Sequence, residues 1–116
     1  MPEPRSKGGR ASRQKGDRKE RQIVKAHHDI GVPAERVPLS GAAGGSFAGD
    51  IDVYVYGDRR AQLVSEVKSR KNGEGFKTLT RWMGENDILF LVEDRHDPLV
   101  VLPWRVWAEL LGAIKR

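Results

Sequence analysis

The sequence predicts a single α/β domain, and three patterns lead to this prediction. Apolar residues recur at three- and four-residue spacing over residues 17–30, as on one face of a helix. Residues 50–56 and 63–69 are typical of the two strands of a hairpin, and two helical stripes with two short apolar strands follow. A chain of 116 residues, 38% hydrophobic and 32% charged, suits one modest core. We expect an arm over residues 1–15 and one domain over residues 16–116.

Composition excludes several kinds of site. The chain has no cysteine, so it has no disulfide, thiolate zinc site or cysteine nucleophile. Its three histidines are too few and too poorly spaced for a histidine-rich metal site. No apolar run reaches the length of about 18 residues that a membrane span needs, so we expect a cytoplasmic, intracellular protein without membrane contact. Any metal should have oxygen ligands.

Positive charge is concentrated near the N-terminus. Residues 1–21 contain eight Lys or Arg and three acidic residues, a net charge of +5, while the rest of the chain is balanced. A basic arm without regular structure over residues 1–15 would attract a polyanion such as DNA. The alternative is a solubilising tail that binds nothing.

The first expected helix, residues 17–30, carries an acidic residue in an unusual place. Gly31 and Pro33 end the helix, and Glu20 lies on the side that holds Val24. A carboxylate aligned with the apolar stripe calls for a metal ion or a paired cation. The alternative is that Glu20 caps the first turn, where acidic residues interact favourably with the helix dipole.

A short β-like segment, residues 36–39, leads into a small-residue loop. Residues 40–49 include four glycines but no Gly-Lys-Ser/Thr ending and no Gly-x-Gly-x-x-Gly that opens a helix, so we expect no nucleotide cofactor. Ser40 does not lie in a Gly-x-Ser-x-Gly elbow, and no histidine and acid are placed to activate it. We expect Ser40 to donate to a phosphate or to form a turn.

Two carboxylates and a lysine lie on the expected hairpin. Asp50 opens the strand over residues 50–56, and Glu66 and Lys68 stand on one face of the strand over residues 63–69. Neighbouring strands are about 4.8 Å apart, so an aspartate and Glu66 can share a cation. Asp50 and Glu66 would bind Mg²⁺ at a scissile phosphate, and Lys68 would position or deprotonate the attacking water. A solvated, charged hairpin face is the alternative.

Further segments extend this pattern over about residues 15–70. The most discriminating is a helical glutamate that follows a glycine by four residues and precedes an arginine. In these segments the chain resembles the archaeal-type Holliday junction resolvases of the PD-(D/E)xK nuclease superfamily. The matching positions are, in order, Lys15-Gly16, Glu20-Arg21, Ile23-Val24-Lys25, Arg36, Ser40-Gly41, Asp50-Ile51 and Glu66-Val67-Lys68.

The resemblance implies a restriction-endonuclease-like αβββαβ core, with a mixed central sheet flanked by helices, and here an extra C-terminal helix. It implies a homodimer that binds branched DNA, a four-way junction, and nicks it symmetrically with Mg²⁺, for which Mn²⁺ should substitute. The implied catalytic residues are Glu20, Asp50, Glu66 and Lys68, and the first three are the implied metal ligands. The residues expected to bind DNA are Lys15, Arg21, Arg36, Ser40, Arg70 and Lys71.

Two other functions stay open. One is a PD-(D/E)xK nuclease with another DNA target, such as a nicking, repair or restriction-like enzyme. The other is a non-catalytic DNA-binding module in which the same charged residues are structural.

The hairpin admits two registers. A hairpin symmetric about residue 58 places Asp50 opposite Glu66, whereas one symmetric about residue 59 places Asp52 there. The alternation puts Asp50 and Asp52 on the same face. The resemblance favours Asp50 as the ligand, with Asp52 as a supporting residue or a ligand of a second metal.

The C-terminal half is expected to complete the core. Residues 76–83 form a helical stripe, residues 88–92 and 99–102 are short apolar strands, and a final helix follows Pro103. Apolar surface left on these helices would suit an isologous dimer. We expect the tryptophans in the core or in the subunit interface rather than stacked on bases.

Overall fold

The computed structural model of the protein describes residues 3–38 and 49–116, with side chains described from residue 16 onward. Contacts divide the chain into two compact units, Met1–Ser69 with Lys115–Arg116, and Arg70–Ile114. The single domain over residues 16–116 stays a prediction. The two units are described separately, as the first and the second unit.

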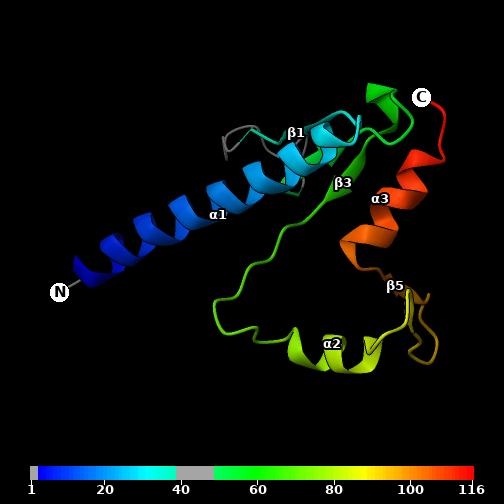
Figure 1. The fold of residues 1–116 in the computed structure, drawn as a ribbon. Coiled ribbons are helices and arrows are strands. Elements are labelled where there is room, and N and C mark those ends of the chain that lie inside the picture. The colour runs from blue at the N-terminus through cyan, green and yellow to red at the C-terminus, as the bar shows by residue number, and fades with distance from the viewer. Residues whose placement is uncertain (1–2, 39–48) are drawn as a thin grey trace. The chain divides into compact units, whose positions relative to one another are not determined.

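The first unit combines a long helix with a three-stranded antiparallel sheet (Figure 1). The helix α1 spans Glu3–Asp29. The strands β1 (Ala34–Arg36), β2 (Ile51–Val53) and β3 (Leu63–Ser65) pair in the order β1-β2-β3. A short 3₁₀ helix, η2 (Arg59–Ala61), lies between β2 and β3.

The C-terminus of α1 follows the sequence prediction closely. Gly31 has φ of 82°, a left-handed conformation that glycine adopts without strain. Its amide donates to the carbonyl of His28 at 3.0 Å, and the amide of Val32 donates to the carbonyl of His27 at 2.9 Å. These two bonds form a Schellman motif, which satisfies the last carbonyls of the helix.

The N-terminus of α1 differs from the prediction. The helix begins at Glu3 and includes residues 3–15, which were expected to be an arm without regular structure. Arg, Lys and Gln in this stretch have good helix propensity, and Pro4 lies in the first turn, where proline is tolerated. No helix in the described ranges has both the length and the apolar character needed to cross a membrane.

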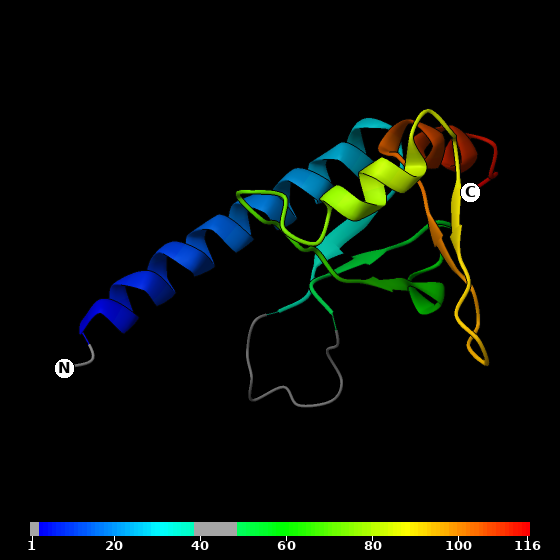
Figure 2. The same ribbon diagram turned by 90° about the horizontal axis from the view of Figure 1, so that it is seen from below.

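The core of the first unit lies between α1 and the sheet. α1 contacts β1 and β2, and Figure 2 shows the helix running across this sheet. His27 is buried on α1 with its ring Nδ1 2.8 Å from the carbonyl oxygen of Ile23. The buried apolar residues of this unit are Val32, Ala34, Val37, Ile51, Val53, Tyr54 and Val55.

The register between β2 and β3 is symmetric about residue 58. Of the two registers left open by the sequence, this is the one that, continued beyond Ile51 and Ser65, places Asp50 opposite Glu66. Asp52 faces Val64, so a pairing of Asp52 with Glu66 is wrong. The paired residues are Ile51 with Ser65, Asp52 with Val64, and Val53 with Leu63.

Both strands are shorter than predicted over residues 50–56 and 63–69. After β2 the chain turns, and the amide of Gly57 donates to the carbonyl of Tyr54 at 3.0 Å. After β3 the amide of Val67 donates to the Asp50 side chain rather than to a strand carbonyl. The Gly57 bond belongs to the turn after β2, and the Val67 bond takes the place of a ladder bond after β3.

The second unit follows the predicted element order. It contains α2 (Lys77–Met83), β4 (Leu89–Leu91), β5 (Leu99–Val101) and α3 (Trp104–Gly112). β4 and β5 pair as an antiparallel hairpin, visible as two adjacent strands in Figure 2. Pro103 precedes α3, as predicted.

The α/β class is confirmed, while the nuclease core with a mixed central sheet stays a prediction. Among the residues described, three α-helices accompany two small sheets in which every pairing is antiparallel. Each strand pairs with its neighbour in sequence, and such neighbours joined by a direct return are antiparallel. A parallel pair needs a longer crossover connection, and none joins paired strands in the described part of the chain.

Candidate functional site

Glu20 lies in the middle of α1 with a side chain that is only 12% exposed. Arg36, at the end of β1, donates from Nε to Glu20 Oε1 at 3.0 Å. A paired cation was one of the explanations expected for a carboxylate in the apolar stripe, together with a metal ion and a cap of the first turn. The cap of the first turn is wrong because α1 begins at Glu3.

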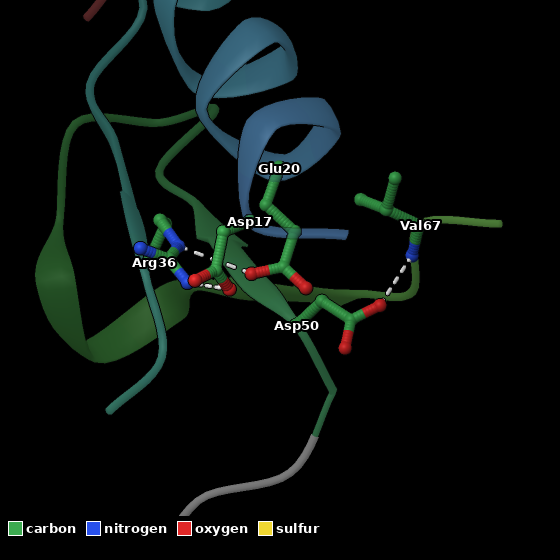
Figure 3. A network of polar contacts seen from close by, with 5 residues as sticks. All are labelled: Asp17, Glu20, Arg36, Asp50 and Val67. Atoms are coloured by element: carbon green, nitrogen blue, oxygen red, sulfur yellow. Dashed lines mark hydrogen bonds and ion pairs between the residues drawn. The ribbon is translucent and has the colours of Figure 1, made fainter. Parts of the chain in front are cut away.

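The same guanidinium reaches a second carboxylate. Arg36 Nη2 donates to Asp17 Oδ1 at 2.7 Å, so Arg36 bridges two acidic residues of α1 (Figure 3). Sequence reasoning missed Asp17. The signal was its position three residues before Glu20, because residues at this spacing share one face of a helix.

Asp50 is half-buried directly before β2. Its backbone amide donates to the carbonyl of Ser65 at 2.8 Å, and Ser65 also faces Ile51 in the ladder. Two residues that share one partner are the mark of a β-bulge, which interrupts the strict alternation of side chains. The prediction that Asp50 and Asp52 share one face assumed strict alternation, and the bulge between them removes that basis.

Gly49 makes this arrangement possible. Its φ is 73°, and a Cβ there would lie 2.7 Å from Val64 Cγ1 and 2.8 Å from the carbonyl oxygen of Ser65. No real Cβ tolerates such distances, so only glycine lets the chain enter β2 this close to β3. The last glycine of the small-residue loop therefore sets the position of Asp50.

The Asp50 side chain holds the segment after β3. Asp50 Oδ2 accepts a hydrogen bond of 2.7 Å from the backbone amide of Val67. Glu66 and Lys68 flank Val67, and Lys68 Nζ lies 3.2 Å from Glu66 Oε2. Both side chains are more than half exposed, at 55% and 60%, so a large ligand can reach them.

The carboxylates of this region keep oxygens available. Glu20 uses Oε1, Asp50 uses Oδ2 and Glu66 uses Oε2 in the bonds given above. Figure 3 shows the side chains of Glu20 and Asp50 extending from α1 and from the start of β2 into the same part of the site. Carboxylate oxygens are the ligands that Mg²⁺ prefers, so these three side chains have the right ligand chemistry for a hard divalent cation.

The carboxylates do not form a closed metal-binding group in this conformation. Among the side chains described, no three acidic or histidine residues are gathered tightly enough to hold an ion. Glu66 is turned towards Lys68.

The predicted DNA-binding residues are distributed over both units. Arg36 is half-buried in the first unit, and Arg21 is exposed on α1. Arg70 and Lys71 are exposed in the second unit. Lys15 belongs to α1, but its side chain is not among those described, and Ser40 lies outside the described residues.

A second polar cluster involves Asp52. Asp52 faces Glu35 of β1, and Arg36, next to Glu35, reaches α1, so the alternation of β-strands places Asp52 on the sheet face away from Glu20. Arg59 Nη1 donates to both oxygens of Glu35 at 3.1 Å, and the Tyr54 hydroxyl donates to Glu35 Oε1. The Arg59 guanidinium also lies 5.0 Å from the centroid of the Tyr54 ring. Because Asp52 lies on the opposite face of the sheet, it does not join the carboxylates around Glu20.

Contacts within this cluster shift the pKa values of its two carboxyl groups, Glu35 and Asp52. The hydrogen bond from Tyr54, and then that from Arg59, hold the pKa of Glu35 below its ordinary value. Burial, and then the charge of Glu35, raise the pKa of Asp52. Sequence reasoning missed the cluster because its members come from two strands and a turn.

Comparison with protein families, curated proteins and solved structures finds no match to this chain. Membership in the resolvase family therefore stays a prediction that rests on the residues of this sequence.

Proposed function

We propose that the protein is a Mg²⁺-dependent endodeoxyribonuclease that is selective for DNA structure and resolves four-way junctions. The hydrogen bond between Asp50 and the amide of Val67 carries the proposal. It fixes an aspartate beside a Glu-x-Lys segment, next to a helix that carries Glu20. The order α1, β1, β2, β3, α2, β4 also agrees with the αβββαβ order expected for such a nuclease.

The proposed roles follow from the chemistry of each side chain. Glu20, Asp50 and Glu66 would hold Mg²⁺, and Mn²⁺ should substitute for it. When bound, the ion supplies positive charge at the scissile phosphate and at the attacking water. Lys68 holds or deprotonates that water, or neutralises charge that develops on the phosphate oxygens. The release of Lys68 from Glu66 would free both side chains for these roles.

Exposed basic residues would bind the DNA backbone. Arg21 on α1, and Arg70 and Lys71 in the second unit, are exposed. The basic residues of the first 15 positions add charge that can neutralise phosphates. Contacts of this kind position the substrate without reading its sequence, as an enzyme that recognises DNA structure requires.

Paired cuts at a symmetric junction need two active sites, so we propose a homodimer. A twofold axis would relate the two sites and match the symmetry of the junction. The second unit exposes large apolar side chains of the kind that an isologous interface buries: Trp82, Phe90, Val92, Leu99 and Val100.

A DNA-binding module without catalysis is the second candidate function. One observation favours it: Glu20 and Glu66 already have cationic partners, Arg36 and Lys68. Ion pairs of this kind are common in proteins that bind no metal. In that case the same residues stabilise the fold and the protein only binds DNA.

Cleavage of labelled DNA tests the proposal. The full chain is incubated with Mg²⁺ or Mn²⁺ and a four-way junction, a flap, a linear duplex or a single strand. We expect cutting of the junction in preference to the other DNAs, and a loss of about 100-fold or more in Asp50→Asn. Asp94→Asn, a change of an exposed aspartate in the second unit, is the matched control and should cut normally.

Each other result has a definite meaning. Equal cutting of the linear duplex would refute junction selectivity and leave a nuclease with another DNA target. Tight DNA binding with no cutting in either metal would refute the nuclease and support the binding module.

A further inference from the structure

The Arg36 guanidinium is shared between two carboxylates on one face of α1. Nε binds Glu20 Oε1 at 3.0 Å, and Nη2 binds Asp17 Oδ1 at 2.7 Å. The side chains are mostly covered, with exposed fractions of 12% for Glu20, 23% for Arg36 and 33% for Asp17. Figure 3 shows the three side chains together, with Asp50 beside Glu20.

The sharing determines how Arg36 binds Glu20. A guanidinium has a planar fork of donors that binds both oxygens of one carboxylate when nothing else competes. Here Asp17 engages Nη2, and the described contacts leave Glu20 bound to Arg36 through one oxygen. Glu20 Oε2 then stays available on the side of Asp50.

Charge acts in the same direction. Arg36 next to Glu20 lowers the attraction of Glu20 for a second cation, because like charges repel at short range. The carboxylate of Asp17, in direct contact with Arg36, offsets that charge. Without Asp17, Arg36 would compete more strongly with a metal ion for Glu20.

We propose that Asp17 is a positioning residue that acts through Arg36 to keep one oxygen of Glu20 open to a divalent cation. The inference rests on the proposed function, since it assumes that Glu20 ligates a metal. It adds a residue that the resemblance to the resolvases does not include.

The first test measures metal binding without DNA. Mn²⁺ is titrated into the full chain, and unbound Mn²⁺ is followed by electron paramagnetic resonance. Asp17→Asn should raise the dissociation constant of Mn²⁺ about 3- to 10-fold, because a charge-assisted bond is redirected onto the ligand Glu20. Asp17→Glu, which keeps the charge, should bind Mn²⁺ nearly as wild type does.

Asp29→Asn is the matched control. Asp29 also lies on α1 and also pairs with a cation, Lys25, at 2.9 Å, but both side chains are exposed. This variant should leave Mn²⁺ binding unchanged. An equal effect of Asp29→Asn and Asp17→Asn would overturn the inference, because it would show that only overall charge matters.

A second readout reports on Arg36 itself. The Nε–H signal of Arg36 in a ¹⁵N NMR spectrum should shift in Asp17→Asn and stay protected from exchange, because Glu20 still accepts from Arg36. In cleavage assays the half-saturating Mg²⁺ concentration should rise by the same factor, while the rate at saturating Mg²⁺ should stay near that of wild type. A lower rate at every Mg²⁺ concentration, with unchanged Mn²⁺ binding, would overturn the positioning role.

The outcomes separate this inference from the proposed function. If wild type binds Mn²⁺ and cuts DNA but Asp17→Asn behaves identically, the inference alone fails. If wild type binds no Mn²⁺ and cuts no DNA, both fail. If Asp17→Asn does not fold, Asp17→Glu decides the question. This variant keeps the negative charge beside Arg36, so it should fold and bind Mn²⁺ as wild type does. Weak Mn²⁺ binding by folded Asp17→Glu would overturn the inference.

Discussion

Asp50 Oδ2 accepts a hydrogen bond of 2.7 Å from the backbone amide of Val67, across the ends of β2 and β3. A side chain thereby takes the place of a strand carbonyl, and β3 ends at Ser65. The segment that follows carries Glu66 and Lys68 on either side of the bonded amide. One carboxylate oxygen therefore both ends a strand and fixes the place of the two other charged residues of the site.

Lys68→Ala separates the two proposed functions. For a nuclease we expect the cleavage rate to fall by about 100-fold or more, because the variant loses the cation beside the attacking water. DNA affinity, measured by fluorescence anisotropy in Ca²⁺, should change by less than about 3-fold, since one phosphate contact at most is lost. Lys115→Ala, a change of an exposed lysine, should leave both quantities unaltered. Unchanged cleavage in Lys68→Ala would exclude the proposed role.

Gly49→Ala should destabilise the first unit. The added Cβ would meet Val64 and the carbonyl of Ser65 at 2.7 and 2.8 Å, in a left-handed backbone conformation. We expect a loss of about 1–3 kcal/mol in the free energy of unfolding, measured by urea denaturation. DNA cleavage should also fall, because Asp50 follows the displaced residue.

Gly16→Ala is the control for this substitution. Gly16 lies inside α1, and beyond its chain neighbours and the adjacent helix backbone no atom lies within 4 Å of a Cβ placed there. This change should stabilise the protein by about 0.5–1 kcal/mol, because alanine favours the helix. Equal stability of the two alanine variants would show that the close approach at Gly49 does not exist in solution.

The sequence was sufficient to predict features that depend on local chemistry. Gly31 correctly predicted the end of α1, and Pro103 correctly predicted the start of α3. The hairpin register was reduced to two choices, and the structure contains the favoured one. These features depend on neighbouring residues and on simple periodicity, which a sequence displays directly.

Features that depend on distant contacts were missed or wrong. The bridge that Arg36 makes from Asp17 to Glu20 was missed, because it needs β1 to lie against α1. The strand lengths failed because a side-chain oxygen of Asp50 replaces a ladder bond. Within each unit the described strands pair with their sequence neighbours, and periodicity alone does not predict strand order.

Asp52→Asn should change stability in a pH-dependent way. Burial, and then the charge of Glu35, raise the pKa of Asp52. A carboxyl whose pKa is higher in the folded chain stabilises the fold when protonated, and this stability is lost as the pH rises from the ordinary value through the folded pKa. We therefore expect Asp52→Asn to melt at a higher temperature than wild type at about pH 7, and the difference to shrink at about pH 3.

The same variant tests the assignment of faces. Because Asp52 lies on the sheet face away from Glu20, Asp52→Asn should keep DNA cleavage within about 3-fold of wild type, whereas Asp50→Asn loses it. A loss of cleavage in Asp52→Asn with an intact melting profile would show that Asp52 acts at the metal. A melting difference that does not vary with pH would contradict the raised pKa.

The basic residues of the first 15 positions should govern the salt dependence of DNA binding. A variant in which they are all replaced by glutamine keeps the helix propensity of the segment and removes only its charge. Each phosphate contact adds about 0.9 to the slope of log affinity against log salt, so we expect the slope to fall by about 3 to 4. At low salt and saturating DNA the cleavage rate should match wild type, because the carboxylates and Lys68 are unchanged. An unaltered slope would show that this segment is only a solubilising tail. The residues replaced are Arg5, Lys7, Arg10, Arg13 and Lys15.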